Sequence, residues 1–271
     1  MKMAGETWEG TGRDLTGCVP HYWGAQPTDP AIETDMQKLP GDIYFNTTTR
    51  QMKMVDPARR VWMVMGEPKI FDDFTGSAID IFKWAIGVAG TGSVIMDVAG
   101  ASVVGGAGRL TDSGALGDNH AQLSAGTNRS LQRAQLTLMH FRIALTSVLA
   151  ITGTRIRAIL HNAGAFNAVG DWAGFELEVV AGPNWRIRSS VGGAAVVDVN
   201  TGVAAVAGSI IDLAILVYQN IAYLYINGVL VGTITAANLT AVLLEPLVYI
   251  DDNDAVGGPI AADVDLIEAY Q

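Results

Sequence analysis

The stretch from Ser209 to Thr233 limits the fold most, because it alternates as consecutive β-strands do. Every second residue from Ile211 to Val217 is a large aliphatic, which is the period that places side chains on one face of a strand. Asn227-Gly228 follows, and this pair tolerates the positive φ that both central residues of a type I′ turn require. The sequence therefore predicts a three-stranded meander that ends in a tight hairpin.

The composition favours packed sheets over a heavily solvated surface. Of 271 residues, 49% are hydrophobic and only 16% are charged, and 31 are glycine. The net charge of −10 and the absence of a basic stripe argue against nucleic acid as a partner. Cys18 is the one cysteine, so no intrachain disulfide is expected. No export signal and no apolar run of membrane-spanning length is present, so we expect synthesis in a cytoplasm and no membrane partner.

Residues 1–40 combine many glycines and prolines with a few aromatic side chains, Trp8, Tyr22 and Trp23 among them. Dense Gly and Pro oppose both helix and sheet, whereas aromatic rings gain free energy when they are buried. We therefore expect an extended N-terminal arm that docks on its own domain, on another copy of the chain or on a partner.

Residues 41–69 form a second segment, in which Gly41 to Thr48 reads Gly-Asp-Ile-Tyr-Phe-Asn-Thr-Thr and a short strand and Trp62 follow. This pattern resembles a small β-module that recurs in tail and other virion proteins of bacteriophages. The alternative is a hairpin of no particular family.

Residues 70–271 read as one domain of about a dozen short strands without a helix-period run, which predicts a sandwich or barrel. The motif from Asp72 to Gly76, then Trp84, and finally Tyr225 to Gly228 resemble the concanavalin A-like lectin/glucanase (laminin G-like) superfamily. The resemblance implies an all-β fold, a jelly-roll β-sandwich, behind the arm and the small module.

Because the superfamily includes glycanases, a catalytic pair of carboxylates must be considered. In the glucanase branch the acids lie on one strand as Glu-x-Asp-x-(x)-Glu, and Glu176 and Glu178 match the first two positions in type. The third position falls on Val180 or Ala181, and neither can transfer a proton. The sequence therefore predicts a chain that is not an enzyme. The alternative for the two acids is an exposed pair that meets nearby arginines, which are Arg155, Arg157, Arg186 and Arg188.

Two further sites are candidates. Asn167, Asp171 and Trp172 lie in a segment of small residues and suit a sugar platform, since aromatic faces stack on pyranose rings. The alternative is that Trp172 covers a sheet edge. No cofactor is expected, although a run of acids, Asp251, Asp252 and Asp254, suits a structural calcium ion. A solvated loop is the other interpretation of that run.

We expect a non-enzymatic structural protein of a phage particle, either a capsid decoration (cement) protein or a tail-associated protein. The expected partners are other copies of the chain, as a homo-oligomer and most plausibly a trimer, and capsid or tail proteins. The alternative is a carbohydrate-binding adhesin or lectin that recognises a host-surface glycan as a receptor. An inactive relative of a glycanase is the third.

Overall fold

The computed structural model describes most of the chain. The described residues are 21–29, 42–49, 51–55, 62–64, 70–75, 78–81, 83–97, 106–112, 120–125, 131–132, 137–146, 154–162, 171–178, 184–218, 220–235, 243–252 and 260–270. The chain divides into two compact units, Met1–Gly66 and Glu67–Gln271.

The smaller unit contains one four-stranded sheet in the order β1-β2-β3-β4. The strands are β1 (Tyr22–Gln26), β2 (Ile43–Asn46), β3 (Gln51–Val55) and β4 (Trp62–Val64). β1 runs parallel to β2, and the other pairs are antiparallel. The buried side chains of Ile43, Phe45 and Met52 give this sheet its own apolar contacts.

The sheet begins earlier than the sequence predicted, because Tyr22 and Trp23 lie in β1 rather than in an irregular arm. Tyr22 is fully buried, and the indole Nε1 of Trp23 donates to Asp42 Oδ2 at 2.9 Å. Asp42 also accepts from the backbone N–H of His21 at 3.0 Å. Asp42 lies about 20 residues from β1 in the sequence, so its hydrogen bonds to β1 could not be predicted from a local pattern. Trp8 lies outside the described residues.

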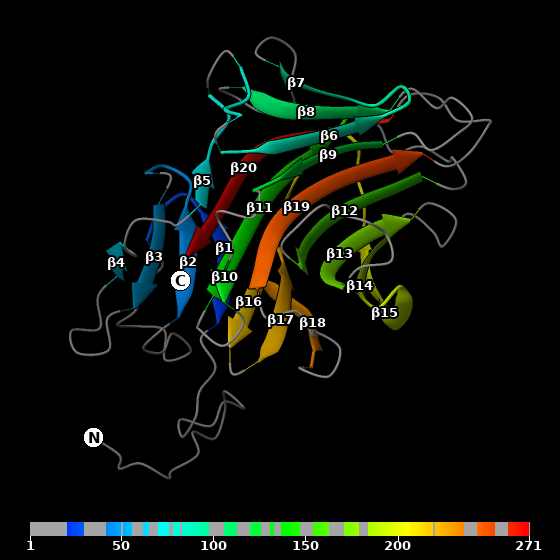
Figure 1. Cartoon of the computed structure of the whole chain (residues 1–271). Coiled ribbons are helices and arrows are strands. Elements are labelled where there is room, and N and C mark those ends of the chain that lie inside the picture. Colours follow the sequence, from blue (N-terminus) through cyan, green and yellow to red (C-terminus); the bar gives the residue numbers. More distant parts are fainter. Residues whose placement is uncertain are drawn as a thin grey trace, which may run out of the picture. The chain divides into compact units, whose positions relative to one another are not determined.

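The larger unit contains two eight-stranded sheets that face each other (Figure 1). The first, called here the front sheet, has the order β15-β14-β13-β12-β19-β9-β6, with β10 beside β19. Its strands are β6 (Ala85–Ala89), β9 (His120–Ser124), β10 (Leu131–Gln132), β12 (Thr154–Asn162), β13 (Trp172–Glu178), β14 (Asn184–Val191), β15 (Ala194–Ala204) and β19 (Leu243–Asp252).

The second sheet, called here the back sheet, has the order β18-β17-β16-β11-β20-β8-β7, with β5 beside β20. Its strands are β5 (Ile70–Asp72), β7 (Ser93–Asp97), β8 (Ala107–Asp112), β11 (Thr137–Leu145), β16 (Ile210–Tyr218), β17 (Ile221–Ile226), β18 (Val229–Ile234) and β20 (Ile260–Tyr270). The last strand β20 thus lies beside the first strand β5 of this unit.

The core fills the space between the two sheets, and each sheet contributes every second residue of its strands. Ile211, Leu213, Ile215 and Val217 of β16 all lie in it, which confirms the predicted alternation. Phe175 and Trp185 enter it from the front sheet and are fully buried. The architecture is the predicted all-β, concanavalin A-like jelly-roll sandwich.

The predicted hairpin joins β17 to β18. Asn227 has φ 50° and Gly228 has φ 78°, the two positive values that the tight turn requires. The Asn227 side chain also accepts a hydrogen bond from the backbone N–H of Asp212 at 3.1 Å, which ties the turn to β16. Among the described residues, no helix is long and apolar enough to cross a membrane.

Candidate functional site

The outer face of the front sheet carries the polar and aromatic residues that the core excludes. Strand register places Tyr249, Arg157, Glu176 and Arg186 in one row across β19, β12, β13 and β14. A second row, two residues along each strand from the first, joins Asp251 through Arg155 to Glu178. A third row, at the other end of the same strands, contains Glu245, His161, Trp172 and Ser190.

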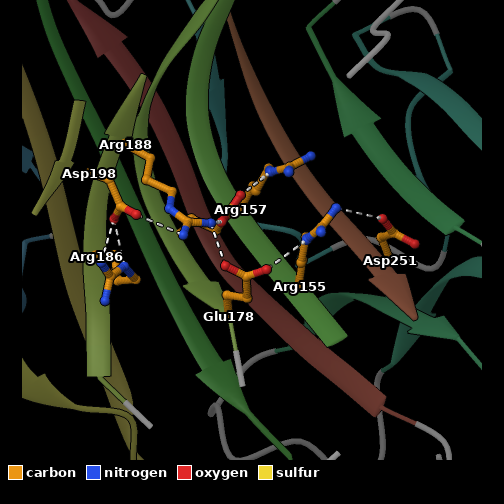
Figure 2. A network of polar contacts seen from close by, with 8 residues as sticks. Arg155, Arg157, Glu178, Arg186, Arg188, Asp198 and Asp251 are labelled. Atoms are coloured by element: carbon orange, nitrogen blue, oxygen red, sulfur yellow. Dashed lines mark hydrogen bonds and ion pairs between the residues drawn. The ribbon is translucent and has the colours of Figure 1, made fainter. Parts of the chain in front are cut away.

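Ion pairs connect this face from β19 to β15 (Figure 2). Arg188 Nη1 donates to carboxylate oxygens of both Glu176 and Glu178, so one guanidinium bridges the two acids. Arg157 Nε donates to the other oxygen of Glu176 at 2.5 Å. At the β15 end, Asp198 accepts from Arg188 Nη2 at 2.9 Å. The predicted meeting of these arginines and glutamates is confirmed for Arg155, Arg157 and Arg188, whereas Arg186 pairs with Asp198 instead.

The two glutamates differ in their surroundings. The sequence allowed an exposed pair of acids, but Glu176 is fully buried between Arg157 and Arg188. Burial raises the pKa of Glu178, but Arg188 and Arg155 lower it more, so this carboxyl stays below its ordinary pKa of 4.5. Glu178 is therefore ionised at neutral pH and can act as a negative charge or a hydrogen-bond acceptor, but not as a proton donor.

An aromatic cluster adjoins the ion pairs. Trp172 and Tyr249 pack with Ile159 and Leu247 on this outer face, and both rings are 7% exposed. The Arg157 guanidinium lies over both rings, 4.8 Å from the Trp172 centroid and 5.5 Å from the Tyr249 centroid. In the same region His161 Nε2 lies 3.0 Å from Glu245 Oε1, and both side chains are almost completely buried.

Several buried polar atoms of this face find no hydrogen-bond partner among the described residues. The donors are Arg157 Nη1, Trp172 Nε1 and Arg188 Nε, the Ser190 hydroxyl can donate or accept, and Gln122 Oε1 is an acceptor. Buried polar atoms in folded proteins are nearly always satisfied, by protein, by water or by a ligand. These atoms therefore need a partner that the described residues do not supply.

The structure describes only part of the predicted sugar platform. Trp172 is the first residue of β13 and is buried, so it does not lie in an accessible loop as expected. Asp171 precedes it and accepts from the backbone N–H of Gly192 at 2.9 Å, which fixes the β14–β15 turn. Asn167 lies outside the described residues.

The predicted calcium site is not assembled by the described residues. Asp251 Oδ2 lies 4.0 Å from Arg155 Nη1 and so belongs to the ion-pair network. The side chain of Asp252 and the whole of Asp254 lie outside the described residues. No group of three or more potential metal ligands occurs in the described part of the chain.

Sequence reasoning missed Arg157 as an aromatic partner, and it missed Tyr249 and Gln122 altogether. One usable signal existed within β13, where residues 172, 174, 176 and 178 must share a face because they alternate. Tyr249 left no such signal, since the pairing of β19 with β12 decides its position.

Comparison with solved structures supports the fold. A glycoside hydrolase family 16 enzyme of Bacteroides ovatus matches with a TM-score of 0.56 and 11% identity, over 74% of this chain and 99% of that chain. The laminarinase catalytic domain of Thermotoga petrophila matches with a TM-score of 0.55 and 10% identity, over 76% and 97%. A glycoside hydrolase family protein of Mycobacterium thermorestibile matches with 0.53 and 15%, over 74% and 99%. No protein-family description and no curated protein sequence matches the chain.

These structural neighbours correct one prediction and leave another without support. The prediction that the chain is not an enzyme is wrong, because the solved structures that share its fold are glycoside hydrolases. Val180 and Ala181, on which that prediction rested, lie outside the described residues. Nothing in these comparisons supports a bacteriophage particle as the context of this chain.

Proposed function

We propose that this chain binds a carbohydrate on the outer face of its front sheet. The observation that carries the proposal is the set of buried polar atoms without a partner among the described residues, Arg157 Nη1, Trp172 Nε1 and Gln122 Oε1 among them. All three lie on strands of this one face. The fold shared with glycan hydrolases supports the same interpretation.

A saccharide suits this surface chemically. Each sugar hydroxyl both donates and accepts, so it can satisfy the free donors of Arg157 and Trp172 as well as the acceptor of Gln122. Trp172 and Tyr249 add apolar walls at the edge of the site, since both rings are 7% exposed and lie beneath the Arg157 guanidinium. Ligand sites generally combine such apolar walls with a few placed polar groups.

The ion-pair network is open to solvent at its two ends and closed between them. The Asp198 side chain is 38% exposed and the Arg155 side chain is 33% exposed, while Glu176 between them is fully buried. A chain of sugars that lies across the strands would therefore contact open charged groups first. Its inner residues would then reach the buried donors of Arg157 and Trp172.

Hydrolysis of the bound glycan is the second candidate, and the carboxylates on β13 favour it. Glu176 and Glu178 share one face and a common Arg188, so their carboxyl groups are close neighbours. Glycosidases work with two carboxyl groups, one of which must donate a proton. Because Glu178 is held ionised, it suits the nucleophile or the charge-stabilising group. Glu245 is not a partner for Glu178, because it pairs with His161, six residues along β12 from the Arg155 that faces Glu178, which is roughly 20 Å.

Binding is tested with the full chain on a glycan array and then by calorimetry with the best polysaccharide, across β-glucans, galactans and uronic-acid polymers. We expect Trp172→Ala to weaken binding about tenfold or more, since the Nε1 donor and the ring beneath Arg157 are lost together. Tyr223→Ala removes an aromatic side chain from β17 in the back sheet and should leave affinity unchanged. No binding by the folded wild-type chain to any polysaccharide would refute the proposal.

Hydrolysis is tested with the same polysaccharides by the release of reducing ends. Activity that Glu176→Gln or Glu178→Gln abolishes, with binding retained, would establish the second candidate. Binding without product would favour the inactive relative of a glycanase. The role in a phage particle stays a prediction from the sequence, and a stoichiometric band in purified particles is its test.

A further inference from the structure

A small cavity lies between the two sheets of the larger unit. It has a volume of about 110 Å³, and its wall includes residues of β14 and β15 from the front sheet and of β11 and β16 from the back sheet. None of the described residues in this wall is charged. Most of the wall is apolar and is formed by Leu145, Trp185, Val203, Val206, Ile210 and Ile211.

An irregular stretch of β15 accounts for the space beside Trp185. Residues 184 and 186 of β14 face residues 204 and 200 of β15, so two steps along β14 correspond to four along β15. The extra residues of β15 form a bulge, and Gly202 within it has φ 73°. A regular strand would place its side chains directly beside Trp185, whereas the bulge leaves room there.

Hydrogen bonds hold the wall of the cavity in place. The Thr201 hydroxyl donates to the carbonyl oxygen of Trp185 at 2.6 Å, which ties the bulge to β14. The backbone N–H of Gly208 donates to the carbonyl oxygen of Leu145 at 2.7 Å, which ties the β15–β16 connection to the end of β11. The cavity is therefore pre-formed, and a ligand need not order its wall on binding.

Trp185 brings one unmet requirement to this apolar wall. Its side chain is fully buried, and its indole Nε1 has no hydrogen-bond partner among the described residues. Buried N–H groups are rarely left without an acceptor, because the hydrogen bond to water that is lost on burial must be replaced. Trp185 belongs to the core, so the outer face of the front sheet does not supply this acceptor.

We propose that the cavity binds a small neutral carbonyl compound, such as a ketone or a lactone. Its oxygen accepts from Trp185 Nε1, and its aliphatic body packs against the apolar wall. An ionised ligand does not fit, because it would lose its hydration without meeting an opposite charge. A carbonyl oxygen also accepts without adding a donor that an apolar wall would leave unpaired.

The size of the cavity limits the ligand. An engineered cavity of about 150 Å³ in another protein holds benzene, so this smaller one suits an aliphatic body of roughly five carbon atoms. Val206 and Ile210 line it and are 57% and 37% exposed, so a longer molecule can extend over them. Water is the rival occupant, but a buried water needs roughly two to four polar partners, and this wall is mostly aliphatic.

The test adds cyclopentanone to the full chain and follows the indole N–H signals by NMR. The Trp185 signal is identified by its absence in Trp185→Phe. We expect saturable binding at roughly millimolar concentration, with a downfield shift of the Trp185 indole proton as it gains an acceptor. Trp185→Phe keeps an aromatic ring and loses the donor, so its affinity for cyclopentanone should fall about fivefold or more. Its affinity for cyclopentane, which has no oxygen, should not fall.

A second variant fills the cavity and leaves Trp185 in place. Ala204 lines the cavity and is exposed, so Ala204→Leu can occupy the space without repacking the core, and it should abolish the binding of cyclopentanone. The matched control is Ala194→Leu, because Ala194 is an exposed alanine at the other end of β15 that does not line the cavity. This control should bind as the wild type does.

The outcomes separate a ligand site from a cavity that holds only water. Binding that shifts the Trp185 indole proton, is lost in Ala204→Leu and is kept in Ala194→Leu supports the proposal, provided that both variants keep the wild-type circular dichroism. A wild type that does not bind cyclopentanone overturns it. Binding that Ala204→Leu leaves intact, or an affinity that Trp185→Phe does not reduce, also overturns it. None of these outcomes depends on carbohydrate binding, which is measured separately.

Discussion

The guanidinium carbon of Arg157 lies 4.8 Å from the centre of the Trp172 ring. The same guanidinium donates from Nε to Glu176 at 2.5 Å and leaves Nη1 without a partner among the described residues. One side chain thus joins the ion pairs, the aromatic cluster and the free donors of the front sheet. The charged and aromatic parts of the surface should therefore respond together to a change at Arg157.

Replacing Arg157 with Gln should lower the free energy of unfolding by on the order of 3 kcal/mol, because it removes one partner of a buried ion pair. Arg157 is 5% exposed and Glu176 is fully buried. The measurement is the midpoint of urea unfolding of the full chain. The same variant should also bind the polysaccharide more weakly.

The control for Arg157 is Arg186→Gln in the same network. Arg186 pairs with Asp198, whose side chain is 38% exposed, and a solvent-exposed pair contributes about 1 kcal/mol or less. The two variants lose the same charge and differ mainly in burial. Equal losses of stability would contradict the assignment of Arg157 to a buried network.

Arg188→Gln should raise the pKa of Glu178. In the native chain burial raises that pKa, while Arg188 and then Arg155 lower it more, to below 4.5. Without Arg188 the opposing burial remains and only Arg155 still favours the charged form. Titration of the Glu178 side-chain carboxyl by NMR would show the change, and an unaltered pKa would mean that Arg188 is not its main partner.

Local pattern was enough to predict much of the fold. The alternation from Ile211 to Val217 is a property of neighbouring residues, and it is observed in β16. The Asn227-Gly228 pair is another, and it forms the β17–β18 turn. The motif around Asp72 was another useful local signal, because the fold that it implied is the one observed. There Asp72 accepts from the Trp84 indole at 2.7 Å and ties the entry to the core.

The site could be predicted only where it followed one strand. Glu176, Glu178 and Trp172 share a face of β13 and were all considered from the sequence. Tyr249 comes from β19, and only the pairing of β19 with β12 brings it beside Arg157. The burial of Glu176 was equally hidden, because it depends on arginines from both neighbouring strands.

His140 of β11 should make stability depend on pH. Its ring lies between Asp212 Oδ2 at 2.7 Å and Glu268 Oε1 at 2.8 Å, on the outer face of the back sheet. Burial lowers the pKa of His140, but the two carboxylates raise it by more than burial lowers it. The net result is a pKa of about 9, compared with an ordinary value of 6.5. A group whose pKa is higher in the folded state stabilises the fold fully at a pH below its unfolded pKa, here about 6.5. This stabilisation is lost as the pH rises through the folded pKa of about 9.

The measurement is the free energy of unfolding between pH 6 and pH 10. The wild type should lose stability across the upper part of this range, while His140→Gln should be less stable at pH 6 and should vary less with pH. The hydroxyl of Tyr270 also donates to Glu268, at 2.9 Å, so Tyr270→Phe controls for other changes at this carboxylate. A pH slope that persists unchanged in His140→Gln would assign it to another group.

The β17–β18 turn should be sensitive to Gly228→Val. Gly228 has φ 78°, and a β-branched residue in that conformation costs about 1–3 kcal/mol. Val229→Ala changes the next residue, which is 63% exposed and has no such requirement, and should shift the melting temperature little. A melting temperature of Gly228→Val equal to that of the wild type would show that the turn tolerates a side chain.

Gly174 should be essential for the packing of β13 against β12. It lies between Trp172 and Glu176 of the candidate site. A Cβ at Gly174 would lie 2.6 Å from the Ala158 carbonyl oxygen and 2.8 Å from Ile159 Cα, and this backbone cannot move without displacing β12. We therefore expect Gly174→Ala to lower both the melting temperature and the affinity for polysaccharide. Gly87→Ala in β6 is the control for the melting temperature alone, because its Cβ would meet only the Gln122 side chain, which the proposed carbohydrate site uses. Equal effects on melting would contradict close strand contact at Gly174.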